Sequence, residues 1–328
     1  MQKRSVCFYT SNNGVGLVAD VSLLQDLLYE HYDIDVVYFD NSLKPPTGGI
    51  AHKKYDVGIW LQTFSEEYFE FAEKNIFIPN EEWLDFKKLS QLKKFDKIIC
   101  KSTLGQQLLR PYNSNVVVSG FISKDRYNPA IKKQDKFIHI MGKSAQKGTE
   151  CILNNFLHTR KDLPLTIIES REGCTLDKTC TAPNVNYIKG FIAEEDLNEE
   201  FNRHSIHLCP SIYEGWGHYL YEALSVGALT YVTKLPMFLE WLDPELVVFL
   251  DCKFEQLKPA RTNVQFLTTD RLDSTHQFGW LVDQDSFDEN VKNYKQHLEK
   301  HNPDKVRKFF NHLNEQNSKN LIEELTDI

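Results

Sequence analysis

Two glutamates separated by seven residues are the side chains best suited to chemistry in this sequence. Glu214 and Glu222 lie in the segment Pro210–Ala228, which reads PSIYEGWGHYLYEALSVGA. The apolar run before this segment predicts a strand, and the pattern after Gly217 predicts a helix, so the glutamates flank a strand-to-helix turn. Carboxylate oxygens accept hydrogen bonds from hydroxyl groups, so a hydroxyl-rich ligand is their natural partner.

The turn between these glutamates favours the binding of an anion. Gly215 and Gly217 allow the backbone to turn sharply and to approach a ligand closely. The first N–H groups of the predicted helix, from His218 to Leu220, have no partner within that helix, and the positive end of its dipole attracts a phosphate. A Gly-x-Gly turn is also common before helices, so the spacing alone leaves a purely structural role open.

A second segment supplies positive charge. Met141–Gly148 reads MGKSAQKG and follows another apolar run, which predicts a loop after a strand. Lys143 and Lys147 in this loop can neutralise the charge that develops on a departing phosphate. The alternative is an ordinary solvated loop.

The elements around these segments predict two parallel sheets. With 328 residues, 41% of them apolar, the chain favours two domains with substantial cores. In the first half, helical patterns at 18–32, 82–94 and 102–109 separate strands at 5–9, 35–39, 57–61, 75–78, 97–101 and 116–119. After a looser segment, Ile122–Lys136, strands follow at 137–141, 165–169, 185–188, 206–208, 229–232 and 247–250, with helices at 147–158, 195–204, 219–226 and 303–325. Strands separated by helices form parallel sheets covered on both faces, so the predicted fold class is α/β.

Several motifs together resemble the retaining glycosyltransferases of family four. Glu214 and Glu222, set in Pro-Ser-x-x-Glu-Gly-aromatic-Gly and Glu-Ala-Leu-x-x-Gly-Ala, resemble the family's donor-site signature. Met141–Gly148 resembles its basic loop, and Asn184–Phe191 resembles the strand that edges the base pocket. Gly14-Val15-Gly16 lies where the family has an N-terminal glycine loop.

This resemblance implies the GT-B architecture, in which two Rossmann-like doubly wound domains enclose a cleft. We therefore expect an acceptor-side domain over residues 1–125 and a nucleotide-sugar-binding domain over residues 126–302. Residues 303–328 would form a C-terminal helix that packs back on the N-terminal domain.

The implied activity is the transfer of a hexose-type sugar from a UDP-, GDP- or ADP-linked donor to an acceptor hydroxyl, with retention of the anomeric configuration. The acceptor would be a glycan, a lipid-linked sugar or a small molecule. Glu214 would contact sugar hydroxyls, Glu222 the ribose, and Lys143 and Lys147 the leaving diphosphate. The donor-binding residues implied by the resemblance are Gly14, Gly16, Gly142, Ser144, Gly190, Phe191, Ser211, Tyr213, Gly215, Trp216, Gly217, His218, Tyr219, Leu220 and Glu222.

The sequence departs from the family pattern on the acceptor side. His218 and Tyr219 stand where many members have Leu-Pro, and Lys143 replaces the more frequent arginine. The family's first-domain histidine has no clear counterpart, and Pro79–Trp83 occupies roughly that region. Its polar residues Asn80, Glu81 and Glu82 are weak acceptor-side candidates. The alternative that we favour for them is a helix cap, in which Asn precedes acidic first-turn residues.

Neither a metal nor a resident cofactor is predicted. Asp33-Ile34-Asp35 has the form of an Asp-x-Asp metal motif but lies far from the donor loop in the sequence. The two lysines and the helix N-terminus can supply the positive charge that a metal would provide. The seven cysteines are odd in number and irregularly spaced, which predicts neither disulfides nor a zinc site and favours a reducing, cytoplasmic compartment.

Three other functions remain open. The net charge is −8, which disfavours general nucleic-acid binding, but lysines crowd the stretch Lys87–Lys101. This stretch is either a solvated face or a surface for an anionic acceptor or a membrane, and it would support an enzyme that glycosylates modified DNA bases. The missing histidine also leaves open a non-catalytic nucleotide-sugar-binding subunit, and a nucleotide-sugar epimerase would share the architecture.

Overall fold

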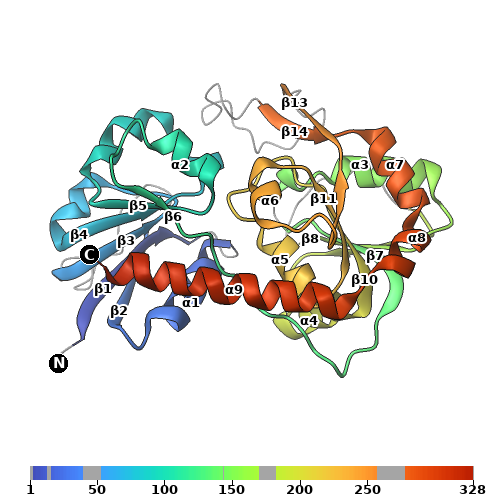
Figure 1. Ribbon diagram of the computed structural model, residues 1–328, viewed down its shortest axis with the longest axis horizontal. Helices are drawn as coiled ribbons and strands as arrows, with labels where there is room; N and C mark the ends of the chain where they lie inside the picture. The colour runs from blue at the N-terminus through green and yellow to red at the C-terminus, as the bar shows by residue number, and fades with distance from the viewer. Residues whose placement is uncertain are drawn as a thin grey trace. The chain divides into compact units, whose positions relative to one another are not determined.

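The computed structural model describes residues 3–12, 16–39, 53–142, 144–169, 182–256 and 278–327. It divides into two compact units (Figure 1). Unit 1 contains Met1–Ser123 and Leu313–Ile328, and unit 2 contains Lys124–His312.

Unit 1 contains a six-stranded parallel sheet in the order β2-β1-β3-β4-β5-β6. Its strands are β1 (Arg4–Ser11), β2 (Tyr32–Phe39), β3 (Tyr55–Leu61), β4 (Ala72–Ile78), β5 (Lys97–Cys100) and β6 (Val116–Val118). The helices α1 (Gly16–Leu28) and α2 (Thr103–Leu109) and the 3-10 helices η2 (Glu66–Phe71), η3 (Glu81–Trp83) and η4 (Phe86–Lys94) connect them. The inner strands β3 and β5 are buried along almost their whole length, as expected for a sheet covered by helices on both faces.

One helix of unit 1 differs from its prediction. The sequence predicts a single helix over 82–94, whereas the structure has the two short 3-10 helices η3 and η4. Asp85 separates them, because its side chain accepts a hydrogen bond from Lys87 N and caps the start of η4.

Unit 2 contains the second six-stranded parallel sheet, in the order β12-β11-β10-β7-β8-β9. Its strands are β7 (Gln134–Ile140), β8 (Leu165–Glu169), β9 (Val185–Lys189), β10 (His204–Cys209), β11 (Leu229–Thr233) and β12 (Val248–Leu250). Its helices are η5 (Ala145–Lys147), α3 (Thr149–Asn154), η6 (Asn155–Thr159), α4 (Glu194–Arg203), α5 (His218–Ser225), α6 (Pro236–Trp241), α7 (Gln284–Lys292) and α8 (Tyr294–Lys300). The strands β13 (Cys252–Gln256) and β14 (Phe278–Val282) form a separate two-stranded antiparallel sheet (Figure 1).

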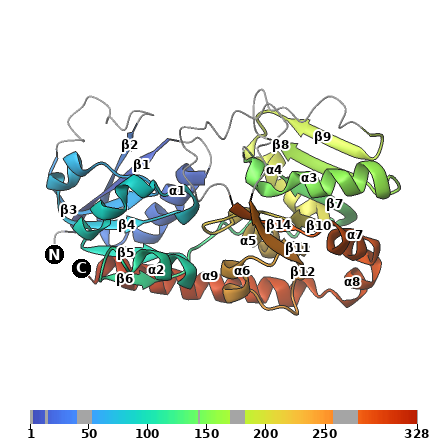
Figure 2. The ribbon, with the colours of Figure 1, turned by 90° about the horizontal axis from the view of Figure 1, so that it is seen from above.

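The last helix, α9 (Pro303–Thr326), is the long red helix of Figures 1 and 2. Its residues from Leu313 onward belong to unit 1. There, Tyr32 donates a hydrogen bond to Leu325 O over 2.7 Å, and Lys97 forms an ion pair with Glu324 over 3.1 Å. Leu321 and Leu325 are fully buried, so this part of α9 covers the core of unit 1.

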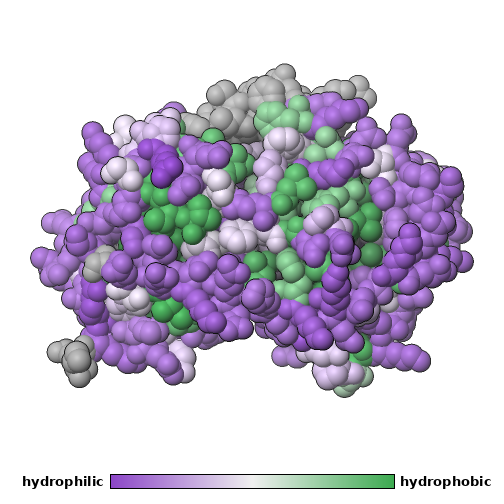
Figure 3. All heavy atoms as spheres, viewed as in Figure 1, coloured by the Kyte–Doolittle hydropathy of each residue, from purple (hydrophilic) through white to green (hydrophobic). Residues whose placement is uncertain are grey.

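The predicted α/β class with two parallel sheets is confirmed. On the face shown in Figure 3, hydrophilic side chains cover most of the surface, with smaller apolar areas between them. Within the described ranges, no helix combines the length and apolar character needed to cross a membrane, and no group of three or more metal-ligating side chains gathers. The cysteines described, Cys7, Cys100, Cys151, Cys209 and Cys252, are free, whereas Cys174 and Cys180 lie outside the described residues.

Candidate active site

The topology of unit 2 marks the place where a ligand is expected. The chain runs from β7 outward to β8 and β9, and then returns to place β10 on the other side of β7. Neighbouring strands whose connections diverge in this way leave a crevice at their carboxyl ends, which is where doubly wound sheets bind ligands. The loops after β7 and β10 are the two segments that the sequence predicts to carry the chemistry.

These two loops touch through their backbones. Gly148 has a left-handed conformation, with φ +68°, and a Cβ atom at this position would lie 1.9 Å from Pro210 O. Ile212 N donates a hydrogen bond to Gln146 O over 2.8 Å. The close approach of the second loop therefore requires glycine at position 148.

Lys147 and Glu214 meet at this junction. The ammonium of Lys147 forms an ion pair with Glu214 Oε1, and Ser211 Oγ donates a hydrogen bond to the same oxygen over 2.6 Å. The side chains are only 20% and 12% exposed, so solvent weakens this pair less than it would a surface pair. The structure thus brings together three predicted site residues from two loops. Lys143, the other predicted cation, lies outside the described residues.

The turn after Glu214 leads into α5 as predicted. Gly217 has φ +91°, and a Cβ atom there would lie 2.8 Å from Phe238 Cζ, so both conformation and space require glycine. Leu220 N donates to Gly217 O over 2.9 Å, which closes the first turn of α5. The positive end of this helix therefore lies one short turn from Glu214 and its partner Lys147.

Two aromatic residues of the predicted donor site anchor this turn by packing. Trp216 is buried and stacks on Tyr221, with ring centroids 4.2 Å apart. Tyr219 is also buried, and its hydroxyl donates to Ile138 O over 3.1 Å. Tyr213 and His218, by contrast, remain partly exposed at the loop.

Glu222 has an internal partner that the sequence analysis missed. Its Oε2 lies 3.0 Å from Arg126 Nε, and Arg126 also contacts Glu194 over 2.8 Å and the ring of Phe201. Burial opposes the charge of Arg126, but the carboxylates of Glu222 and Glu194 outweigh it and raise the pKa of the guanidinium. The only sequence signal for Arg126 was its place in the looser segment Ile122–Lys136.

A buried histidine, His139, joins the strands that lead into the two loops. His139 Nδ1 lies 2.8 Å from Leu208 O, and His139 Nε2 lies 2.9 Å from Thr149 Oγ1. Burial lowers the pKa of His139 to about 4, so the ring is neutral near pH 7. It connects β7, β10 and the start of α3. The sequence showed it only as a polar residue inside an apolar strand.

The remaining donor-side predictions lie along the same edge of the sheet. Gly142 has φ +59° with open space around it, and Ser144 Oγ accepts a hydrogen bond from Gln146 N over 3.2 Å. Gly190 follows β9 with φ +93°, and the next residue, Phe191, is 92% exposed. An exposed ring is available for stacking on a flat ligand. In unit 1, Gly16 begins α1, whereas Gly14 lies outside the described residues.

Asn80 occupies the N-cap position of η3, with Glu81 and Glu82 in the first turn. Its side chain makes no cap hydrogen bond. Asn80 Oδ1 instead accepts from Lys101 Nζ over 2.7 Å, and Nδ2 donates to Gln62 Oε1 over 3.0 Å. Lys101 also pairs with buried Asp20 over 3.2 Å. These residues form a polar cluster at the carboxyl ends of β3, β4 and β5.

The acidic residues beside Asn80 are partly buried. Glu81 lies against Gly105 of α2, where a Cβ atom would come within 1.8 Å of its Oε1. Burial raises the pKa of Glu81 to about 7. Gln62, which bonds to Asn80, is the one non-glycine residue with positive φ, at +64°, among those the structure describes. Backbone strain of this kind persists where surrounding contacts hold it, and it is frequent at functional sites.

The lysine-rich stretch does not form one surface patch. Lys97 and Lys101 are buried in the ion pairs described above, and Lys88 donates to Phe64 O over 2.6 Å. Lys94 is exposed but forms an ion pair with Glu66. Lys87, Lys93 and Lys94 are exposed, whereas the other three lysines of Lys87–Lys101 serve the fold of unit 1.

Comparison with known proteins identifies the fold. No family model and no curated protein matches the chain. Among solved structures, a glycosyltransferase from Rickettsia africae superposes with a TM-score of 0.69 at 9% identity, covering 100% of this chain and 99% of the other. A sucrose-phosphate synthase from Thermosynechococcus elongatus gives 0.67 at 11% identity and covers 98% and 96%. Anabaena HepE in complex with UDP and glucose gives 0.67 at 11% identity and covers 99% and 100%.

These similarities extend over the whole chain, and the fold is that of the GT-B glycosyltransferases, as predicted.

Proposed function

We propose that this protein is a glycosyltransferase that moves a hexose-type sugar from a nucleoside-diphosphate donor to an acceptor hydroxyl, with retention at the anomeric carbon. The observation that carries the proposal is the meeting of Lys147, Glu214 and the start of α5 at the switch point of the second sheet. Structural neighbours support the donor class, since one was solved with UDP and glucose and another, the pneumococcal O-GlcNAc transferase GtfA, with UDP and GlcNAc.

The chemistry needs positive charge at one place. The bond between the anomeric carbon and the diphosphate oxygen breaks, and its electron pair stays on the diphosphate. The acceptor oxygen forms the new bond and releases its proton. Lys147, together with Lys143 and the N-terminus of α5, would stabilise the growing charge, and one such preorganised group contributes roughly 3 kcal/mol in a measured case.

The two glutamates would orient the donor. Glu214 fixes Lys147 beside the helix start and presents its carboxylate to sugar hydroxyls. Glu222 would bind the ribose hydroxyls. A carboxylate has about four acceptor positions, so the contact with Arg126 leaves acceptor capacity for a ribose.

On the acceptor side, we propose Asn80 and its neighbours Glu81 and Glu82 in place of the family's histidine. Asn80 is held by hydrogen bonds to two other strand ends, which gives it a fixed orientation at the carboxyl edge of the first sheet. Asn80→Ala is expected to raise the KM for the acceptor more than that for the donor.

A panel of labelled donors tests the proposal. The protein is incubated with UDP-, GDP- and ADP-hexoses, with and without candidate acceptors, and the anomeric configuration of any product is determined by NMR. A product with the donor's configuration, lost in Lys147→Ala but retained in the exposed-lysine control Lys161→Ala, is expected. Binding without transfer or hydrolysis would instead indicate a non-catalytic subunit, and conversion of the donor without acceptor would indicate an epimerase.

Among the alternatives, glycosylation of DNA bases has lost its support. The reason for considering it was the crowding of lysines in Lys87–Lys101, and two of these, Lys97 and Lys101, are buried in ion pairs of unit 1.

A further inference from the structure

The main chain of Arg126 is held between two helices of unit 2. Its N–H donates to Ser225 Oγ at the end of α5 over 3.0 Å, and its carbonyl oxygen accepts from Asn202 Nδ2 of α4 over 2.6 Å. Ser225 and Asn202 are themselves buried. Ser225 Oγ also donates to Glu222 O over 2.7 Å. Arg126 is therefore fixed in position relative to the turn of α5 that carries Glu222.

The guanidinium of Arg126 is divided between two carboxylates. Its Nε lies 3.0 Å from Glu222 Oε2, and its Nη1 donates to Glu194 Oε1 over 2.8 Å. The guanidinium carbon lies 4.7 Å from the centre of the Phe201 ring, which supports the group from one side. Because the donors of a guanidinium have a fixed geometry, contacts at two different nitrogens set the direction of both.

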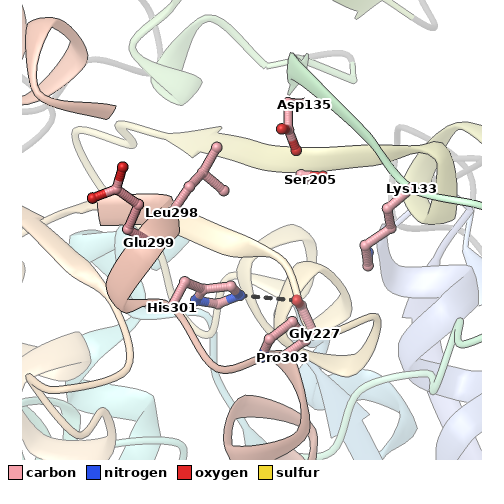
Figure 4. A pocket seen from close by; sticks show the side chains of 8 residues that line it. All are labelled: Lys133, Asp135, Ser205, Gly227, Leu298, Glu299, His301 and Pro303. Atoms are coloured by element: carbon pink, nitrogen blue, oxygen red, sulfur yellow. Dashed lines mark hydrogen bonds between the residues drawn. The ribbon is translucent and has the colours of Figure 1, made fainter. Parts of the chain in front are cut away.

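The helix that carries Glu222 is also held at its far end. His301 Nε2 lies 3.1 Å from Gly227 O, at the wall of a pocket (Figure 4). Gly227 has φ +67°, and a Cβ atom there would lie 2.9 Å from Pro303 O. Glu222 therefore projects from a helix whose end is fixed, and its remaining freedom lies in its own side-chain torsions.

The contact with Arg126 restricts those torsions. With Oε2 of Glu222 beside the guanidinium, Oε1 keeps its acceptor positions in one direction. The side chain of Glu222 retains 14% of its exposure, whereas that of Arg126 is 8% exposed and acts through the carboxylate. A carboxylate of fixed orientation suits two hydroxyl groups at a fixed separation, such as the 2′- and 3′-hydroxyls of a ribose.

We propose that Arg126 is a positioning residue that makes donor binding selective for ribonucleotides, because it orients Glu222 toward the ribose hydroxyls. This inference rests on the proposed contact between Glu222 and the ribose. A carboxylate that is oriented before the ligand arrives loses less conformational entropy on binding. Loss of Arg126 should therefore weaken the binding of ribonucleotides and leave nucleotides without these two hydroxyls almost unaffected.

Calorimetric titration with UDP, GDP and ADP and with their 2′,3′-dideoxy analogues measures this selectivity. For the diphosphate that binds most tightly, we expect the parent to prefer the ribonucleotide over its dideoxy analogue roughly 10- to 100-fold, since hydrogen bonds to a charged group are of this strength. In Arg126→Met and in Glu222→Ala, this ratio should fall to about threefold or less, because the oriented charge-assisted hydrogen bonds are lost.

Two further variants separate positioning from general damage. Arg203, which pairs with Glu199 and Glu200 on α4, is the matched control, and Arg203→Met should keep the parental ratio. Combining Arg126→Met with Glu222→Ala should lower the ratio no further than Glu222→Ala alone, since a residue that acts through another adds nothing once that residue is gone.

Removing one partner of a buried ion pair is destabilising, so Arg126→Lys serves as a milder variant. It keeps the charge, but its single nitrogen cannot hold Glu222 and Glu194 in the geometry of a guanidinium. Its ratio should lie clearly below that of the parent, and this variant decides the question if Arg126→Met does not fold.

The outcomes distinguish this inference from the proposed function. The inference alone is overturned if Glu222→Ala loses the selectivity but the Arg126 variants keep it, or if they weaken both nucleotides of a pair equally, as a purely structural role would. If the parent binds none of the three diphosphates, or if Glu222→Ala keeps the parental ratio, the proposed contact between Glu222 and the ribose fails, and the role of Arg126 fails with it.

Discussion

The carboxylate of Glu222 lies 3.0 Å from the guanidinium of Arg126, which is buried and shared with Glu194. The second of the two glutamates predicted to bind the donor is therefore part of an ion-pair network within unit 2. This network fixes the orientation of Glu222 before any ligand arrives.

Replacing Glu222 should weaken nucleotide binding. In Glu222→Ala we expect roughly 10- to 100-fold lower affinity for the preferred nucleoside diphosphate, because a hydrogen bond to a charged group contributes about 1.5–3 kcal/mol. Calorimetric titration measures this change. The exposed Glu195→Ala is the matched control and should bind as the parent does. Equal affinity in both variants would remove Glu222 from the donor site.

Removing the ammonium of Lys147 should affect the chemical step. For Lys147→Met we expect kcat to fall about 100-fold or more, since one preorganised donor to a developing oxyanion is commonly that important. The donor KM should change much less. Steady-state kinetics with Lys161→Met as control measures both constants. A variant with parental kcat would show that Lys147 only positions Glu214.

The contact between the two loops predicts a difference between two glycines of the same loop. Gly142 and Gly148 have similar positive φ angles, but only Gly148 faces another backbone, at Pro210 O. Gly142→Ala should cost about 1–2 kcal/mol of unfolding free energy from conformation alone. Gly148→Ala should cost clearly more and reduce transfer. Denaturant unfolding of both variants measures the difference, and equal costs would contradict the approach of Pro210 as the reason for glycine at this position.

Glu81 predicts a pH dependence of stability. Its pKa is raised by burial from 4.5 to about 7 in the folded protein, so folding favours the neutral acid. The raised pKa of Glu81 contributes on the order of 3 kcal/mol to the free energy of unfolding. This contribution is complete below pH 4.5 and is lost as the pH rises through 7. The stability difference between the parent and Glu81→Gln should therefore change progressively between about pH 4.5 and 7.5, with the parent losing stability relative to the variant as the pH rises. Melting curves across this range test the trend. The exposed Glu73→Gln should show no such change, and a flat difference for Glu81→Gln would place its pKa near the ordinary value.

The strands were predictable because their signal is local. β8 has the bounds 165–169 that its apolar run predicts, and the strand-to-helix turn at Gly217 follows from glycine chemistry. The alternation of strands and helices, from which two parallel sheets were predicted, is also a local signal in the sequence. Such features depend on neighbours in the sequence and on covering both faces of a sheet.

The missed features depend on contacts between distant residues. Arg126 meets Glu222, and His139 meets Leu208, only because the fold brings separate segments together, with β7 and β10 as neighbours in the sheet. Asn80 has the sequence of a cap, but the hydrogen bonds to Lys101 and Gln62 compete successfully for its side chain. The short elements α6, α7 and β13–β14 lacked a periodic pattern long enough to stand out.

The division of α9 between the units determines which fragments of this protein can be expressed separately. Unit 1 consists of two stretches of sequence, and the second of them, from Leu313 onward, supplies buried Leu321 and Leu325. A fragment that ends near residue 123 would expose the surface that these leucines cover, so expressing the first half alone should yield an aggregating product. A circular permutant that joins the end of α9 to the start of β1 would keep both stretches together, and it is the sound starting point for isolating that half.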